Sequence, residues 1–148
     1  MLRFIPAIFC LITGSIFLAA PTAVQAQPGS AETGPNTPEH LLDGTSFNYF
    51  YQNGSGLWIT FYDGMLEYEW IAGPRTGNRA ADLSYDSRRM AEGLYLVSWH
   101  EANKPDYVTL VVNLQNNVIY SSSILRYGTE NELTVFQGGI IEHVQRTR

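Results

Sequence analysis

A glutamate at the end of an alternating run is the residue best suited to carry out chemistry. Residues two apart share one face of a strand. One face of the predicted strand 93–101 therefore carries Tyr95, Val97, Trp99 and Glu101. Because this set is bulky and mostly apolar, we expect it to point inward, which places a carboxylate beside an indole. A buried carboxylate is costly unless it has a partner. A strand-end carboxylate that faces water is the alternative that the pattern leaves open.

Two tyrosines and an arginine are the next candidates. Tyr49 and Tyr51 lie two apart, so both phenols project from one strand face and could donate paired hydrogen bonds to a carboxylate or phenolate. Ordinary strand aromatics are the alternative. Arg79 follows a loop rich in glycine and proline, and could pair with Glu101 or bind an anionic substrate. Arg75 competes for that role, and a solvated surface arginine is the alternative.

The other reactive residue types do not form a recognisable site in the sequence. His40, His100 and His143 have no metal-ligand spacing, and Cys10 is the only cysteine. No nucleophile-elbow motif accompanies a serine, and no helix follows a phosphate-binding glycine loop. We therefore expect neither a metal nor a cofactor.

Short runs with strand composition must position these candidates. They are rich in Tyr, Trp, Phe, Val and Ile, and turn residues such as Asn53-Gly54 and Gly138-Gly139 separate them. The predicted strands are 46–52, 56–62, 65–71, 79–85, 93–101, 106–113, 117–125, 132–137 and 139–144. No long helical period is present. The pattern predicts an all-β domain, either a closed up-and-down barrel or a sandwich, and about eight strands would enclose one small ligand.

The first 26 residues resemble a secretory signal peptide. Arg3 precedes an apolar run, and small residues precede a predicted cleavage site after Ala26. A membrane anchor is the alternative, but Gly14 and Pro21 interrupt the run. We therefore expect a periplasmic or secreted protein with no stable membrane insertion after cleavage.

The remaining chain is predicted to contain one domain after a linker. Residues 27–40 are rich in proline, glycine and polar residues, which indicates a disordered linker, and residues 41–148 form the domain. The formal net charge is −5, and basic residues do not cluster over any long stretch. This balance argues against nucleic acid as a partner.

Together, these pieces resemble the phenolic acid decarboxylase family and the related MoaF-like domains. The matching pieces are Tyr49-x-Tyr51-x-Asn53-Gly54, Tyr68-x4-Gly73 leading to Arg79, Glu92-Gly93-Leu-Tyr95-Leu-Val-Ser98-Trp99-His-Glu101, Asp106-Tyr-Val-Thr-Leu and Glu132-Leu-Thr-Val. The resemblance covers about residues 41–146. It implies a calycin- or lipocalin-like antiparallel β-barrel of about eight or nine strands, and relatives suggest a homodimer.

The resemblance also implies a reaction and its residues. The family's two tyrosines, arginine and glutamate correspond to Tyr49, Tyr51, Arg79 and Glu101, and we expect Trp99, Tyr68 and Val97 to bind the substrate. The implied reaction is the cofactor-free decarboxylation of a 4-hydroxycinnamic acid. Protonation of the side-chain carbon next to the carboxylate gives a quinone methide, which loses CO2 to give a vinylphenol. The tyrosines would hold one oxyanion end, and the glutamate would act as general acid and base.

Several departures from the family pattern favour a rival function. Ala80 stands where decarboxylases usually have a bulky aromatic residue, and His100 and Ala102 replace the threonine and proline that flank the glutamate. The chain also stops at Arg148, without the family's C-terminal extension, and carries a predicted export signal. These features suit a non-catalytic periplasmic protein that binds an aromatic anion in the same pocket. A third alternative is an interaction domain whose own side chains fill the pocket.

Overall fold

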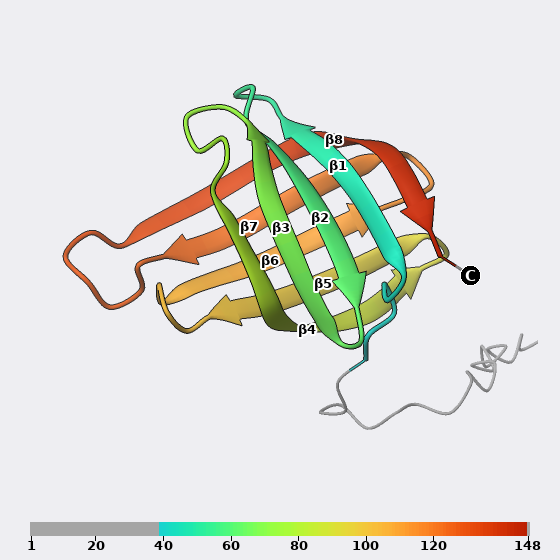
Figure 1. Ribbon diagram of the computed structural model, residues 1–148, viewed down its shortest axis with the longest axis horizontal. Helices are drawn as coiled ribbons and strands as arrows, with labels where there is room; N and C mark the ends of the chain where they lie inside the picture. Colours follow the sequence, from blue (N-terminus) through green and yellow to red (C-terminus); the bar gives the residue numbers. More distant parts are fainter. Residues whose placement is uncertain (1–38, 148) are drawn as a thin grey trace, which may run out of the picture. The chain divides into compact units, whose positions relative to one another are not determined.

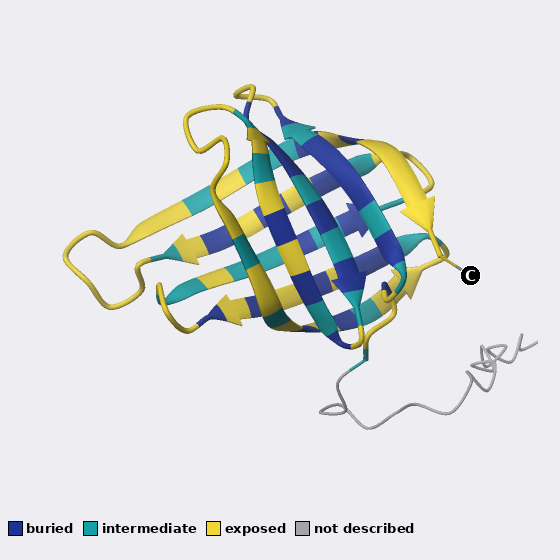
Figure 2. Ribbon diagram, viewed as in Figure 1, coloured by how far each residue is buried: buried dark blue, intermediate teal, exposed yellow. Residues whose placement is uncertain are grey.

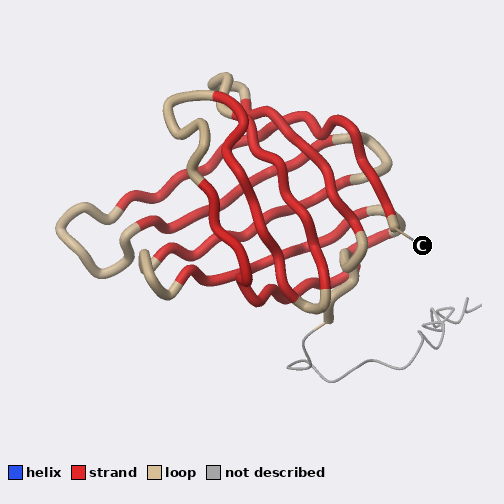
Figure 3. The backbone as a smooth tube through the Cα atoms, viewed as in Figure 1, coloured by secondary structure: helices blue, strands red, loops and turns tan. Residues whose placement is uncertain are grey.

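A computed structural model describes residues 39–147, and within this range the chain forms a closed antiparallel barrel of eight strands (Figure 1). Figure 3 shows that strands and loops make up all of this part of the chain. The strands are β1 (Thr45–Tyr51), β2 (Gly56–Tyr62), β3 (Met65–Ala72), β4 (Arg79–Ala91), β5 (Leu94–Glu101), β6 (Asp106–Asn113), β7 (Val118–Leu125) and β8 (Leu133–Arg146). The all-β barrel prediction is confirmed. The predicted signal peptide, 1–26, and residues 27–38 of the predicted linker lie outside the described residues.

The last two predicted strands form one strand, which corrects the sequence prediction. Gly138 and Gly139 continue the ladder inside β8, opposite Tyr120 and Ile119 of β7. They do not form a turn. The absence of a side chain on Gly139 lets β8 approach β1 closely. A Cβ atom on Gly139 would lie only 2.6 Å from the carbonyl oxygen of Phe50 in β1.

Strand β4 is also longer than predicted. It continues past residue 85 to Ala91, because its second half pairs with β5 from Tyr85 opposite Trp99 onward. The first half of β4 pairs with β3, with an irregular register between Leu66 and Tyr68. A single long strand therefore joins the two sides of the barrel.

The up-and-down order places alternate connections at opposite ends of the barrel. Residues 52–55, 73–78, 102–105 and 126–132 connect strands at one end, which we call the open end. The chain enters β1 at the other, closed end, where Leu42 is 1% exposed. There the Asp43 carboxylate accepts hydrogen bonds from the Tyr85 hydroxyl at 2.9 Å and from the Gly64 backbone N–H at 2.9 Å.

Glu39 and His40, the last two residues of the predicted linker, contact β4 near this closed end. The Ser87 backbone N–H donates to the Glu39 carbonyl oxygen at 2.7 Å, and Arg88 pairs with the Glu39 carboxylate at 3.1 Å. The His40 ring packs edge-on against Tyr85 with centroids 5.2 Å apart. Among residues 39–147, no helix is long and apolar enough to cross a membrane.

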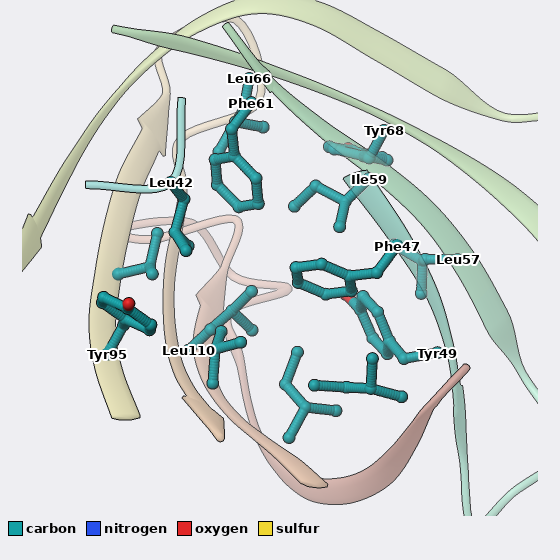
Figure 4. Close-up of a cluster of buried hydrophobic side chains, with 14 of the residues drawn as sticks. Leu42, Phe47, Tyr49, Leu57, Ile59, Phe61, Leu66, Tyr68, Tyr95 and Leu110 are labelled. Atoms are coloured by element: carbon teal, nitrogen blue, oxygen red, sulfur yellow. The ribbon is translucent and has the colours of Figure 1, made fainter. Parts of the chain in front are cut away.

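The hydrophobic core lies inside the barrel. Buried and exposed residues alternate along most strands, as the banding in Figure 2 shows. Figure 4 shows Phe47, Ile59, Phe61 and Leu66 directed at one another from the first three strands. All four are 0% exposed. Because each fully buried large apolar side chain stabilises the fold by roughly 1.5–3 kcal/mol, this packing holds the first three strands together.

Candidate functional site

A cavity of about 260 Å³ occupies the open half of the barrel. The inward-facing residues change character along the strands toward it: Phe47 is followed by Tyr49 and Tyr51 in β1. In β5, Val97 is followed by Trp99 and Glu101. The lining residues are Tyr49, Tyr51, Leu57, Tyr68, Trp70, Arg75, Asn78, Trp99, Glu101, Lys104, Asp106, Val108, Ser121, Ser123, Leu125, Val135 and Gln137.

Glu101 is the hub of the hydrogen-bond network in this cavity. The Glu101 residue is only 5% exposed. Its carboxylate accepts hydrogen bonds from the Tyr68 hydroxyl at 2.9 Å and from Lys104 Nζ at 2.9 Å. The Trp99 indole N–H lies 3.4 Å from Oε1 of the same carboxylate. Lys104 Nζ also lies 3.3 Å from the Tyr68 hydroxyl. The expectation that this carboxylate points inward and has partners is therefore met.

The network shifts the titration of its two donors. Burial, followed by the charge and hydrogen bond of Glu101, raises the pKa of Tyr68 to about 12. Partial burial lowers the pKa of Lys104, but its hydrogen bond to Glu101 and its interaction with Tyr68 outweigh that effect, so the net shift is upward. At neutral pH, Tyr68 is a neutral phenol and Lys104 a cation, and both donate to Glu101.

The tyrosine pair predicted from β1 forms a second polar group in the cavity. The Tyr51 hydroxyl donates to the Tyr49 hydroxyl over 3.4 Å, and the two rings meet edge to face. Burial, reinforced by the neighbouring Tyr51, raises the pKa of Tyr49 well above its usual range. Tyr49 therefore stays a neutral phenol, able to donate a hydrogen bond to a ligand.

Not every residue predicted for the site lines this cavity. Tyr49, Tyr51, Tyr68, Trp99 and Glu101 do. Val97 shares their face of β5 but lies deeper, in the apolar core, at 0% exposure.

Arg79 lies outside the cavity. It pairs in register with Glu69, an exposed residue of β3, whereas Ala80 pairs with the inward-facing Tyr68. Because paired residues share a sheet face, Arg79 points outward, and the predicted partnership with Glu101 is replaced by that of Lys104. Arg79 instead lines an outer pocket that Glu101 and Lys104 also line.

The structure adds two cations that sequence reasoning missed or left open. Lys104 is three residues after Glu101, and the turn Ala102–Pro105 brings its ammonium back to the carboxylate. Arg75, the competitor of Arg79, lines the cavity with its guanidinium 4.6 Å from the centre of the Trp70 ring. The sequence feature that could have identified Lys104 is a lysine three residues after a glutamate, within the turn that follows a strand.

The cavity can bind a small organic molecule through stacking and hydrogen bonds. Within residues 39–147, no group of three or more His, Cys, Asp or Glu side chains could hold a metal ion. The lining instead combines aromatic rings with hydroxyl, amide and charged groups, which is the usual composition of a ligand site.

Comparison with known proteins identifies the family. The family model described as MoaF-like matches residues 43–140. The chain belongs to the MoaF-like family. This match covers most of the barrel and confirms the MoaF-like part of the resemblance inferred from the sequence motifs. No curated protein matches the sequence of this MoaF-like chain.

A solved structure resembles the MoaF-like barrel. It is the crystal structure of a "putative beta-lactamase" from Burkholderia vietnamiensis, with a TM-score of 0.59 and 17% sequence identity. The match covers 72% of this chain and 98% of that chain. At this identity the likeness shows a shared fold.

Proposed function

We propose that this MoaF-like barrel binds a small phenolic or aromatic acid in its open-end cavity. The observation that carries the proposal is the cavity itself, in which aromatic rings surround the Tyr68–Glu101–Lys104 network. Its volume of about 260 Å³ lies just below the usual range for drug-sized ligands, which favours a single-ring compound. Flat rings would stack on Trp70 and Trp99.

The charges of the lining suit a ligand with one negative charge at the mouth. Arg75 and Lys104 are balanced by Glu101 and Asp106. Lys104 is already committed to Glu101 at 2.9 Å. Arg75 lies on an exposed loop beside Trp70, so its guanidinium is the group placed to meet a ligand carboxylate.

Tryptophan fluorescence tests this binding directly. Two of the three tryptophans, Trp70 and Trp99, line the cavity. Titration of the purified protein with p-coumaric, ferulic and cinnamic acids should quench their emission in a saturable way. Trp70→Phe and Trp99→Phe variants should each lose part of that response. An unchanged spectrum with all three acids, supported by calorimetry, would contradict the proposal.

A second candidate function is cofactor-independent decarboxylation of the bound acid. The observation that favours it is the position of Glu101, a carboxylate in the cavity wall whose partners Tyr68 and Lys104 could exchange protons with it. Loss of the ultraviolet absorbance of p-coumaric acid would measure turnover. Turnover that disappears in Glu101→Gln would support the lyase, whereas binding without turnover would leave a binding protein.

Hydrolysis of a β-lactam, suggested by the description of the Burkholderia structure, is not part of the proposal. Ser121 and Ser123 line the cavity and hydrogen-bond to each other at 3.1 Å. A serine nucleophile needs an adjacent base, and neither serine is hydrogen-bonded to a base among the described contacts.

We also propose that the protein is exported, as expected from residues 1–26. Cell fractionation tests this location.

A further inference from the structure

A further pocket lies at the closed end of the barrel. It has a volume of about 430 Å³ and is lined by Arg89, Glu92, Gly93, Tyr95, Leu114, Gln115 and Arg146. These residues belong to the β4–β5 and β6–β7 turns, to the strand ends beside the first of these turns, and to the last position of β8. None of these seven residues lines the open-end cavity. The closed-end pocket is therefore separate from the site of the proposed function.

Strand register places two arginines of this pocket in the inward-facing rows of the barrel. Arg89 of β4 pairs with the buried Tyr95 of β5. Arg146 of β8 pairs with Thr45, which begins the inward-facing row of β1. Because paired residues share a sheet face, both guanidinium groups belong to the inward side. Two cations from distant parts of the chain thus meet at one pocket.

The positive charge of the pocket is not neutralised by neighbouring carboxylates. Within residues 39–147, neither Arg89 nor Arg146 forms a salt bridge, whereas the adjacent Arg88 pairs with Glu39 at 3.1 Å. Glu92 is the single carboxylate of the lining, so the lining has a net charge of +1. The whole chain has a formal net charge of −5. A local excess of positive charge in an acidic protein favours an anionic ligand.

The Tyr95 hydroxyl is an additional donor without a partner. Tyr95 is only 9% exposed, and Figure 4 shows it at the margin of the buried cluster. A tyrosine buried to this extent usually has a hydrogen-bond partner for its hydroxyl. In the part of the chain that the structure describes, the Tyr95 hydroxyl has none. A ligand in the closed-end pocket would supply the missing acceptor.

The donors of the pocket suit a tetrahedral anion. A single guanidinium can satisfy both oxygens of a carboxylate in a bidentate pair. A phosphate monoester has three acceptor oxygens and a charge between −1.5 and −2 at neutral pH. It can therefore contact two guanidinium groups and a phenol together. We propose that the closed-end pocket binds the phosphate group of a phosphate monoester through Arg89, Arg146 and Tyr95.

Calorimetric titration in a low-salt, phosphate-free buffer tests the site. The probes are inorganic phosphate, glycerol 3-phosphate and acetate, and the two phosphates should bind more tightly than acetate. Arg89→Gln and Arg146→Gln should each weaken phosphate binding about tenfold, because each removes charge-assisted hydrogen bonds. Arg88→Gln is the matched control, since it removes the same charge from the outward-facing neighbour. Its phosphate affinity should stay within about twofold of the wild type.

Two further variants distinguish ligand binding from a structural role. Tyr95→Phe should weaken phosphate binding about threefold. It should leave the melting temperature unchanged, because the hydroxyl has no partner in the folded protein to lose. Glu92→Gln should strengthen phosphate binding, because it removes the one negative charge of the lining. Thermal unfolding of every variant verifies that it is folded.

Several results would overturn the inference. Equal losses in Arg88→Gln and Arg89→Gln would show a response to net charge alone, and acetate binding as tight as phosphate binding would refute the ligand class. Absence of phosphate binding in both the wild type and Glu92→Gln, with vesicles as well as soluble probes, would refute the site.

A lipid headgroup is one source of the same phosphate chemistry. Vesicles that contain phosphatidic acid present a phosphate monoester at a membrane surface. Cosedimentation that requires Arg89, without binding of glycerol 3-phosphate, would uphold phosphate recognition and assign it to a lipid. Fluorescence titration with cinnamic acid reports on the open-end cavity separately. The inference and the proposed function can therefore fail independently.

Discussion

Nζ of Lys104 lies 2.9 Å from Oε2 of Glu101, and this ion pair stands where the barrel cavity meets an outer pocket. Glu101 is almost completely buried, whereas the Lys104 side chain is 52% exposed. The lysine therefore neutralises a buried carboxylate from the solvent side. Tyr68 completes the group from inside the barrel, with its hydroxyl in contact with both residues.

Removing the ammonium should destabilise the barrel and disturb the cavity. In Lys104→Met, the Glu101 carboxylate keeps Tyr68 and Trp99 but loses its cation. Because Lys104 is half exposed, we expect a decrease of about 1 kcal/mol in the free energy of unfolding. Urea denaturation measures this quantity. Lys104→Arg, which keeps the positive charge, should lose less, and equal losses in both variants would argue against an electrostatic role.

Arg75, in the β3–β4 loop, and Arg79, the first residue of β4, offer a test of where an anion binds. Arg75 lines the cavity, whereas Arg79 pairs in register with the exposed Glu69. Arg75→Gln should weaken binding of p-coumaric acid about tenfold, since one charge-assisted hydrogen bond is lost. Arg79→Gln should weaken it less. Titrations at low and high salt measure both effects. A larger loss of affinity in Arg79→Gln than in Arg75→Gln would indicate that Arg79 binds the anion.

Stability should fall at high pH because Tyr68 must lose its proton. Burial and Glu101 raise its pKa from 10.0 to about 12. A group with a raised folded-state pKa contributes stability that is complete below its unfolded pKa and is lost as the pH rises through the folded pKa. The free energy of unfolding should therefore decline between about pH 10 and 12.

The same measurement on two tyrosine variants isolates this contribution. Tyr68→Phe removes the titrating phenol and should show a shallower decline in urea midpoint over that pH interval. Lys104, whose pKa is also raised, leaves part of the decline in place. Tyr120→Phe changes a half-exposed tyrosine and should follow the wild type. Identical curves for all three proteins would refute the assignment to Tyr68.

Two adjacent glycines in β8 should differ sharply in their tolerance of alanine. A Cβ on Gly139 would meet the Phe50 carbonyl oxygen at 2.6 Å, and backbone atoms of the closing β1–β8 pair cannot move easily. Gly139→Ala should cost about 1–3 kcal/mol of stability. On Gly138, the nearest atom belongs to the Tyr120 side chain at 3.1 Å, which can move. Gly138→Ala should change stability by less than about 0.5 kcal/mol, and thermal denaturation would compare the pair.

Alternation along the chain predicts most of the strands and which candidate side chains face the barrel interior. In β5, period-two spacing correctly placed Tyr95, Val97, Trp99 and Glu101 inside, because a strand with one buried face has only one workable orientation. The same pattern does not show how deep each residue lies. Only the structure shows that Val97 lies in the core and Trp99 lines the cavity.

The errors arose where strand pairing, rather than local pattern, decides the structure. Gly138-Gly139 has the composition of a turn, but their role is a close approach to β1, which is distant in sequence. The orientation of Arg79 depends on its register with β3 beside an irregularity. Lys104 lies in a turn whose conformation no hydrophobic period encodes. Each of these features requires knowledge of the partner strand or of the turn.

The division of the barrel into a packed half and a hollow half has an evolutionary consequence. Residues such as Phe47, Phe61 and Leu66 belong to the apolar core, whereas the polar lining residues Ser121, Ser123 and Gln137 do not. Substitutions at these polar positions can therefore accumulate and be selected for new ligands while the fold persists. For the same reason, a library randomised at Ser121, Ser123 and Gln137 is a practical starting point for engineering sensors on this scaffold.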